Sequence, residues 1–500
     1  MTISNALSSL IILPLIMAPV VYLAGRISVR SGKSKNIACW IALLVLLAAF
    51  FPLVILFQAY RSQGIITLTV YAISFRMDGI AFLMSALVLG LGTLVTLFSI
   101  VYMQGEEGEE KFYALLVAMI GTIIGLSCAG DLFNLWVWFE TMAVSSYMLV
   151  AFYRNQPGSL EAGVKYLVQS AVGSVFIVLG IALVFAVSGT LDLQEIGAQA
   201  TVSPLYITAG AFFLIGFGVK SALVPLHTWL PDAHSQAPSG ISAMLSGVVI
   251  EAGLIALLRS LAPIFDSSAA WGNLIMIFGA VNMLVGNLLA LRQNQVKRML
   301  AFSSISHMGY IVTGIGIAVT FQQADGAAGS FFHLTTHAMM KGLAFLSAGA
   351  MMYVLFISKG RHDILTRDDL CGAASKYPLI AFVFSLAVLS LGGLPPLAGF
   401  MSKWQILLSG FQTHQQSTLW LSIFMGLNSV LSLAYYAPLV NRMYRKEPCE
   451  AVREGKPAGF WLTLPLVCLA AGIIILGFYP SLLEGVFQAA GASLLMAFGG

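Results

Sequence analysis

Apolar segments of about 20 residues, the length that crosses a bilayer as a helix, recur along almost the whole chain. Short polar connections separate them. The pattern predicts an all-α polytopic membrane protein with about fourteen transmembrane helices. In chain order the segments are 6–24, 37–60, 80–103, 112–128, 132–152, 166–187, 207–227, 241–258, 271–291, 299–319, 331–357, 379–407, 419–439 and 460–478.

The first apolar segment and the last one each allow more than one interpretation. Residues 1–10 carry no Lys or Arg, so the first apolar segment predicts a retained span and not a cleaved signal peptide. Residues 482–498 form a shorter, Gly-containing apolar segment. This last segment fits either a fifteenth span or a helix lying along the membrane surface.

Composition excludes a water-soluble enzyme. Of the 500 residues, 59% are hydrophobic and 9% charged, whereas roughly a quarter of the residues in soluble domains are charged. The five cysteines are scattered without a CxxC pair, so neither a metal site, an iron–sulfur site nor a disulfide framework is indicated. We therefore expect no cofactor, no metal and no redox centre in this chain.

The basic residues set the orientation through the positive-inside rule. With the N-terminus outside, only Arg61, Arg76 and Arg259 face outward, and Lys165, Lys220, Lys341 and Lys403 lie within or beside spans. The acidic loop 106–110 also falls inside and is interpreted as a solvated surface. The eighteen residues on the cytoplasmic side are Arg26, Arg30, Lys33, Lys35, Lys111, Arg154, Arg292, Lys297, Arg298, Lys359, Arg361, Arg367, Lys376, Arg442, Arg445, Lys446, Arg453 and Lys456.

Several ionisable side chains fall inside predicted spans, where each costs about 2.5 to 3.5 kcal/mol on insertion scales. One buried pair could serve only to fix helix packing. A series of acids, lysines and histidines over six spans indicates instead a chain of groups that bind and release protons. The members are Glu140, Lys220, Glu251, Lys341 and Lys403, with His307, His333 and His337 beside them.

Three of these residues share one helix face. His333, His337 and Lys341 are spaced i, i+4, i+8, which places them about 6 Å apart along a helix. Two histidines at i, i+4 can also bind a metal, but no third ligand is evident and Lys341 would repel a cation. The stripe therefore favours a proton relay over a metal site or a set of core histidines.

Two predicted spans contain helix breakers. Span seven carries Pro225 and Pro231 after Lys220, and span twelve carries Gly392, Gly393, Pro395 and Pro396 before Lys403. Proline opens a helix, and unwound backbone at membrane depth is tolerated only inside protein or along a wet cavity. Each break predicts a hydrated path beside a buried lysine.

The breaks lie five spans apart, a separation that inverts orientation as in inverted-repeat transporters. When Pro225 is aligned with Pro396, Leu223 matches Leu394 and Leu226 matches Leu397. Trp229 then faces Phe400, while the two lysines fall on opposite sides of the register. The alignment favours an internal inverted repeat without establishing it.

These segments resemble the antiporter-like proton-pumping subunits of respiratory complex I, a family shared with membrane-bound hydrogenases and Mrp-type Na+/H+ antiporters. The resemblance covers residues 75–445, and its strongest part is the buried lysine with Trp-Leu-Pro-Asp. The segments that carry it are Phe139-Glu140-Thr141-Met142, Lys220 with LVPLHTWLPDAH, LSGVVIEAG from Leu245, AFSSISHMGY from Ala301, FFHLTTHAMMKGLAFLSAG from Phe331, and LPPLAGFMSK ending at Lys403.

The resemblance implies two inverted five-helix half-channels, 112–260 for spans four to eight and 271–445 for spans nine to thirteen. N-terminal helices (1–111) and a C-terminal helix with a tail (446–500) would flank them. It also implies that Glu140 partners Lys220, and that the two histidines and Lys341 lead toward Lys403, the exit-side lysine. Lys220 would release its proton when Glu140 moves away. One departure is Glu251, where many relatives carry a lysine.

The resulting expectation is a proton-translocating subunit of a respiratory complex of the NADH:quinone oxidoreductase or hydrogenase type. It would hold no redox site itself and would bind other membrane subunits, lipid and protons, but no nucleic acid, in the cell membrane of a prokaryote. The alternative is an Mrp-type antiporter subunit, in which sodium is exchanged for protons. A purely structural or quinone-binding subunit and an unrelated twelve-span solute carrier fit the series of buried charges less well.

Overall fold

The protein is described by a computed structural model over residues 2–31, 37–71, 73–199, 203–265 and 269–499. Lys33 and Lys35, two of the predicted cytoplasmic charges, lie outside the described residues. The helices are α1 Ile3–Arg30, α2 Ile37–Gln63, α3 Gly79–Tyr102, α4 Glu109–Cys128, α5 Leu132–Val150, α6 Pro157–Ser188, α7 Leu193–Gln199, α8 Pro204–Lys220, α9 Trp229–Gln236, α10 Ser239–Met244, α11 Ile250–Leu261, α12 Ala269–Leu291, α13 Val296–Phe321, α14 Ala324–Leu355, α15 Ala373–Lys376, α16 Pro378–Gly392, α17 Ala398–Gln412, α18 Gln416–Arg445, α19 Glu450–Glu454, α20 Phe460–Phe478 and α21 Glu484–Ala497.

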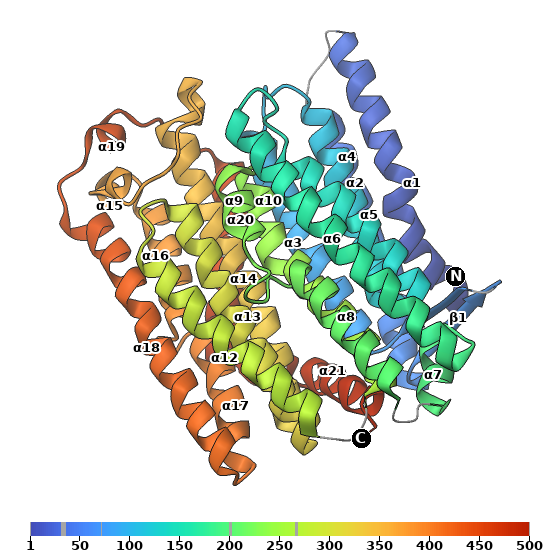
Figure 1. The fold of residues 1–500 in the computed structure, drawn as a ribbon. Helices are drawn as coiled ribbons and strands as arrows, with labels where there is room; N and C mark the ends of the chain where they lie inside the picture. The colour runs from blue at the N-terminus through green and yellow to red at the C-terminus, as the bar shows by residue number, and fades with distance from the viewer. Residues whose placement is uncertain (1, 32–36, 72, 200–202, 266–268, 500) are drawn as a thin grey trace.

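The long helices run side by side as one bundle (Figure 1). Eleven helical segments in the described parts of the chain are long and apolar enough to cross a membrane. Two shorter apolar helices, α8 and α16, continue beyond a break as α9 and α17. The predicted multi-span helical architecture is confirmed. The total of fourteen stays a prediction, because it also needs α5 and the two broken helices to cross.

The short elements gather at the two ends of the bundle. α15 and α19 lie at one end, and α7, α21 and strand β1 lie at the other (Figure 1). β1 (Ile66–Val70) pairs antiparallel with β2 (Ile73–Met77). This hairpin was not predicted, because its β-branched residues were assigned to a connection between spans.

Two aspartates fix where helices begin next to this hairpin. Asp78 caps α3 by accepting a hydrogen bond from the backbone N–H of Ala81 (2.9 Å). Its carboxylate also forms a buried two-pronged ion pair with the guanidinium of Arg259 on α11 (2.9 and 3.1 Å). Asp131 caps α5 in the same way through Asn134 (2.7 Å).

The centre of the bundle is formed by α11, α13 and α14. Every residue from Ser239 to Leu261 is buried, and α13 and α14 are buried over most of their length. By contrast, outer helices such as α6 and α18 expose large apolar side chains, including Val175 and Val430. Exposed apolar faces on outer helices are what contact with lipid requires, so the ionisable groups on α11, α13 and α14 lie far from that surface.

The segment after α20 forms a short surface helix. α21 has 14 residues, which at 1.5 Å per residue is about 21 Å and too short to cross a bilayer. It packs against α14 and α3, and its Ser493 hydroxyl accepts a hydrogen bond from the N–H of Gly79 (3.0 Å). Of the two predicted alternatives for this segment, the structure favours the surface helix.

Two predicted surface charges are buried. Glu109 and Glu110, expected in a solvated loop, are each 4% exposed, because α4 begins at Glu109 and packs its first turn against α1. Glu110 accepts a hydrogen bond from Arg26 of α1 (3.3 Å). Lys297, counted among the cytoplasmic charges, is also only 4% exposed. The interpretation of Glu109 and Glu110 as solvated surface was therefore wrong, whereas the cytoplasmic placement of Lys297 stays a prediction.

Candidate proton path

Lys220 is the last residue of α8, where the seventh predicted span is interrupted. The break contains the cis peptide bond Val224–Pro225, and the chain resumes as a helix at Trp229. The Lys220 side chain is fully buried, and its ammonium donates a hydrogen bond to the hydroxyl of Tyr166 on α6 (2.6 Å). The ammonium also lies 4.4 Å from the centre of the Tyr166 ring, a cation–π distance.

Glu140 lies on α5 next to this lysine without a direct ion pair to it. Among the described residues no ion pair joins Glu140 and Lys220. The two side chains interact electrostatically only at longer range. One Glu140 oxygen is buried and has no hydrogen-bond partner within the described chain. In this conformation a tyrosine hydroxyl, and not the carboxylate, holds the Lys220 ammonium.

Lys403 lies beside the second break, between α16 and α17. Its ammonium donates to the carbonyl of Leu391 in the last turn of α16 (2.8 Å) and to the Ser429 hydroxyl (3.1 Å). It also sits 4.7 Å from the centre of the Tyr310 ring. A carbonyl at the C-terminal end of a helix carries a partial negative charge. The break after α16 therefore provides a carbonyl that stabilises the buried ammonium of Lys403.

The two breaks share a local backbone pattern when Pro225 is aligned with Pro396. Three positions earlier, Ala222 (φ 53°) and Gly393 (φ 80°) both adopt a left-handed conformation. The following amide in each break donates to a carbonyl five residues back, at 2.9 and 3.1 Å. The similarity holds at the breaks, while the two complete inverted half-channels stay a prediction.

Glu251 follows an irregular turn in the eighth predicted span. The π-helical turn Leu245–Val249 joins α10 to α11 just before it, and such turns often occur at functional sites. Glu251 is fully buried and pairs with Nδ1 of His337 on α14 (2.8 Å). The other Glu251 oxygen and Nε2 of His337 have no hydrogen-bond partner among the residues described.

The three histidines form one buried cluster. Nδ1 of His307 on α13 lies 3.1 Å from Nε2 of His333, and Nδ1 of His333 lies 2.9 Å from the hydroxyl of Ser402. The His307 ring is 5.4 Å from that of His337. Because Ser402 precedes Lys403, polar groups are continuous from Glu251 to the neighbourhood of the second break.

Lys341 belongs to a branch of this path. It is fully buried one turn beyond His337, and its ammonium donates to the carbonyl of Leu300 (2.9 Å) and the hydroxyl of Ser303 (2.6 Å). Ser303 in turn bonds the hydroxyl of Tyr436 on α18. The predicted stripe is therefore present on α14, but its lysine is held by α13 and not by the histidines.

The structure brings five of the seven predicted site residues into one buried region, Glu251, His333, His337, Lys341 and Lys403. Lys220 on α8 lies beside this region, with its side chain packed against Gly253 of α11, two residues from Glu251, and Glu140 lies on α5. Residues missed from sequence include Tyr166 and Ser402. Hydroxyl side chains are common in helices, and no spacing signal marks the ones that face a buried cation. In the described parts of the chain, no group of three His, Cys, Asp or Glu side chains could hold a metal ion.

Two family models match the sequence. The model described as NADH:quinone oxidoreductase/Mrp antiporter, TM, covers residues 129–432. The model described as NADH-ubiquinone oxidoreductase (complex I), chain 5 N-terminus, covers residues 68–113. Together they include both breaks and every buried Asp, Glu, Lys, Arg and His side chain discussed above.

Curated relatives match over nearly the whole chain. The chain is 32% identical over 462 residues to F(420)H(2) dehydrogenase subunit N of Methanosarcina mazei, covering 90% of this chain and 91% of that one. It is also 32% identical over 460 residues to NADH-quinone oxidoreductase subunit N of Trichlorobacter lovleyi, covering 90% of each.

Solved structures match at the level of the complete fold. A chain of the membrane-bound sulfane sulfur reductase, an archaeal respiratory membrane complex, superposes with a TM-score of 0.87 at 27% identity and 98% coverage of both chains. A chain of respiratory complex I from Thermus thermophilus gives 0.77 at 26% identity, covering 96% of this chain and all of that one. A chain of the Mrp complex from Dietzia sp. gives 0.86 at 22% identity, covering 99% and 98%, and this match supports the fold alone.

Proposed function

The chain belongs to the NADH:quinone oxidoreductase/Mrp antiporter family, and on this premise we propose that it is the proton-translocating, antiporter-like membrane subunit of a respiratory complex. The redox-complex relatives and structural neighbours named above are membrane subunits of such complexes. The chain's own contribution is the buried series of ionisable side chains.

The observation that carries this proposal is the continuity of polar groups inside an apolar bundle. Glu251, His337, His307, His333 and Ser402 follow one another at hydrogen-bond or ring-contact distance from α11 to α17. Burying this many ionisable groups is costly. Histidines in contact can pass a proton because each ring accepts at one nitrogen and donates at the other.

The proposed route joins both halves of the chain. Lys220 and Glu140 form the switch in the first half-channel (112–260), and Lys403 delivers protons at the break in the second (271–445). Movement of Glu140 away from Lys220 makes the charged ammonium less favourable, so the lysine gives up its proton toward Glu251 and the histidines. Lys341 supplies a further proton-binding group beside them.

The membrane location, the orientation and the partner subunits of the chain follow from the same proposal. We propose a multi-pass location in the prokaryotic cell membrane with the N-terminus outside, supported by the predominance of basic residues at the end of the bundle that carries α15 and α19. Other membrane subunits of a multi-subunit complex are the expected partners, as for the structural neighbours. Electron transfer would occur in those partners, with no cofactor in this chain.

The second candidate function is sodium/proton exchange as an Mrp-type antiporter subunit. The fold match to an Mrp complex is the observation that supports this alternative. The curated relatives named above belong instead to redox complexes. Purification of the tagged chain with its partners separates the two. Redox subunits together with electron-driven proton uptake support the leading proposal. A set of small membrane subunits with sodium-driven proton movement would contradict it.

A further inference from the structure

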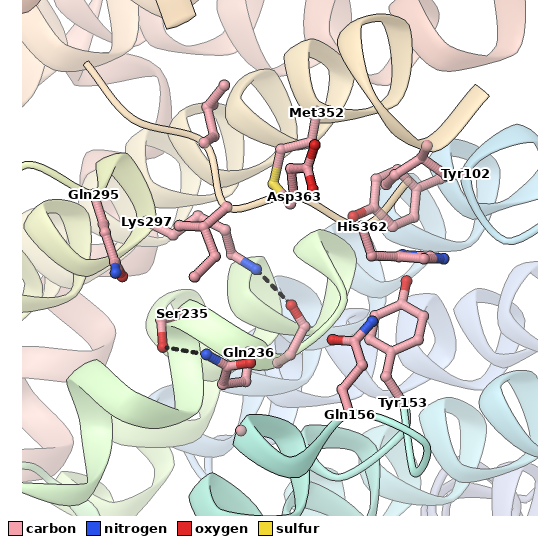
Figure 2. A pocket seen from close by; sticks show the side chains of 15 residues that line it. Tyr102, Tyr153, Gln156, Ser235, Gln236, Gln295, Lys297, Met352, His362 and Asp363 are labelled. Carbon is pink, nitrogen blue, oxygen red and sulfur yellow. Dashed lines mark hydrogen bonds between the residues drawn. The ribbon is translucent and has the colours of Figure 1, made fainter. Parts of the chain in front are cut away.

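A cavity of about 320 Å³ lies at the end of the bundle that carries α15 and α19. It is enclosed by the beginnings of α6 and α13, the ends of α9 and α14, and the loop after α14. Figure 2 shows its side chains: Tyr102, Tyr153 and His362 lie together on one side, Lys297 lies across from them, and the Gln236 amide is turned toward Ser235. None of these groups belongs to the proton path described above.

The outer wall of the cavity reaches the protein surface. Ile364 in its lining is 44% exposed, and His362 lies 3.5 Å from the carboxylate of Glu106. Burial raises the pKa of the Glu106 carboxyl above its ordinary value, and the neighbouring His362 partly opposes this rise. Water can therefore reach the cavity past a polar, titratable rim.

Lys297 forms the inner wall on the first turn of α13. Its side chain is 4% exposed, and its ammonium donates to the carbonyl of Ala237 at the end of α9 (2.5 Å; Figure 2). The described ion pairs give it no carboxylate partner. An ammonium carries three donors, so two of them need acceptors, and the adjoining cavity of about 320 Å³ has room for water that can supply them.

His234 lies deeper, one turn before Ala237 on α9. Its ring is fully buried and stacked on Phe345 of α14 (4.6 Å, 11°), yet neither ring nitrogen has a hydrogen-bond partner within the described chain. Phe345 is one turn from Lys341. Both Lys297 and Lys341 are close enough to His234 to interact with it electrostatically.

We propose that Lys297 and His234 form a proton uptake branch that connects this cavity with Lys341. The inference rests on the proposed function, because it names a source of the protons that reach Lys341. Neutral Lys297 takes a proton from hydronium in the cavity. Its ammonium then passes a proton through water to one nitrogen of His234, and the opposite nitrogen releases a proton toward Lys341. In each step the group that releases the proton loses one unit of positive charge, and the group that binds the proton gains one.

A purely structural role makes a different prediction. If Lys297 served only to cap α9 through Ala237, a permanent cation that keeps N–H donors, as in Lys297→Arg, would replace it. An uptake role needs a group that can both bind and release a proton. The two roles are therefore separated by substituting a titratable cation and a permanent cation at the same position.

The test uses Lys297→Cys in the intact complex in inverted vesicles. The thiol is modified with an aminoethyl methanethiosulfonate reagent, and labelling is quantified by mass spectrometry; Lys297→Arg provides the permanent cation that keeps N–H donors. We expect the unmodified Cys variant to pump at least tenfold more slowly than wild type, the aminoethyl group to restore most of the rate, and Lys297→Arg to pump as slowly as the unmodified Cys variant. Lys359→Cys, at the same end and outside the cavity lining, and the wild-type complex are treated in parallel as controls.

Three results would overturn the inference: wild-type pumping by unmodified Lys297→Cys, wild-type pumping by Lys297→Arg, or no restoration by a quantitatively attached aminoethyl group. Modification of Lys297→Cys by a membrane-impermeant methanethiosulfonate reagent only from the opposite membrane face would also contradict it.

His234→Phe supplies an independent test, because the phenyl ring keeps the stack on Phe345 and removes both nitrogens. We expect a loss of pumping at least as large as for Lys297→Cys. Lys220→Ala, measured alongside, separates the two levels of inference. Normal pumping in His234→Phe with loss in Lys220→Ala refutes the uptake branch alone. Normal pumping in both variants refutes the proposed function.

Discussion

The contact between Lys220 and Tyr166 gives a prediction that sequence reasoning alone did not provide. Tyr166→Phe removes the hydroxyl that accepts the Lys220 hydrogen bond at 2.6 Å. It keeps the ring 4.4 Å from the ammonium and the stack of that ring on Trp229 (3.9 Å, 7°). The substitution therefore isolates one hydrogen bond to a buried charge.

The size of the effect follows from that single bond. A hydrogen bond to a charged group contributes about 1.5 to 3 kcal/mol net, and each 1.4 kcal/mol is a factor of about ten in population. We expect the ratio of protonated to neutral Lys220 to fall about ten- to a hundredfold in Tyr166→Phe. Because Lys220 and Glu140 form the switch of the proposed route, pumping should fall by up to the same factor.

The assay is the initial rate of proton uptake by inverted vesicles, followed with a pH-sensitive dye while electron transfer is measured in the same sample. Tyr113→Phe is the matched control, because the Tyr113 hydroxyl is equally buried and has no hydrogen-bond partner among the described residues. Pumping by Tyr166→Phe within twofold of wild type would refute the reasoning. An equal loss in Tyr113→Phe would do the same.

Three further predictions concern other parts of the molecule. Glu251→Gln keeps the shape of the histidine contact and removes the charge, so transport should slow without loss of assembly; an unchanged rate would assign Glu251 to packing. Asp78→Asn keeps the cap of α3 but leaves Arg259 as a buried unpaired charge. It should lower stability by about 3 to 5 kcal/mol, seen as a lower thermal inactivation temperature, and a loss below about 1 kcal/mol would show that the pair is solvated. Since burial raises the pKa of Glu106, the carboxyl becomes neutral at a higher pH than an ordinary glutamate as the pH falls, and its pair with His362 is lost. Tryptic cleavage of the His362 loop should therefore increase in mild acid in wild type and be high at neutral pH in Glu106→Gln; equal cleavage of the two proteins at neutral pH would contradict this.

The stripe of His333, His337 and Lys341 could be predicted from sequence because helical periodicity alone places the three residues on one face. The breaks beside Lys220 and Lys403 could be predicted because proline and glycine act locally. All three features depend on short stretches of chain. They needed no knowledge of which helices pack together.

Contacts between distant helices could not be predicted in this way. Tyr166 meets Lys220 only because α6 packs along α8, and Ser402 meets His333 only because α17 packs on α14. The positive-inside rule treated Lys297 as a loop charge, whereas the loop after α14 folds over the first turn of α13 and buries it. Hydrophobic pattern and charge locate the helices, but the pairing of their faces determines the path.

The most direct test of the proton path is Lys220→Ala in a purified complex whose assembly has been verified. Lys165→Ala serves as its control, because Lys165 is half-exposed and forms ion pairs with Glu161 and Asp232. The measurement is proton uptake by inverted vesicles at a matched rate of electron transfer. We predict that uptake stops in Lys220→Ala and persists in Lys165→Ala. Normal uptake in a fully assembled Lys220→Ala complex would contradict the account.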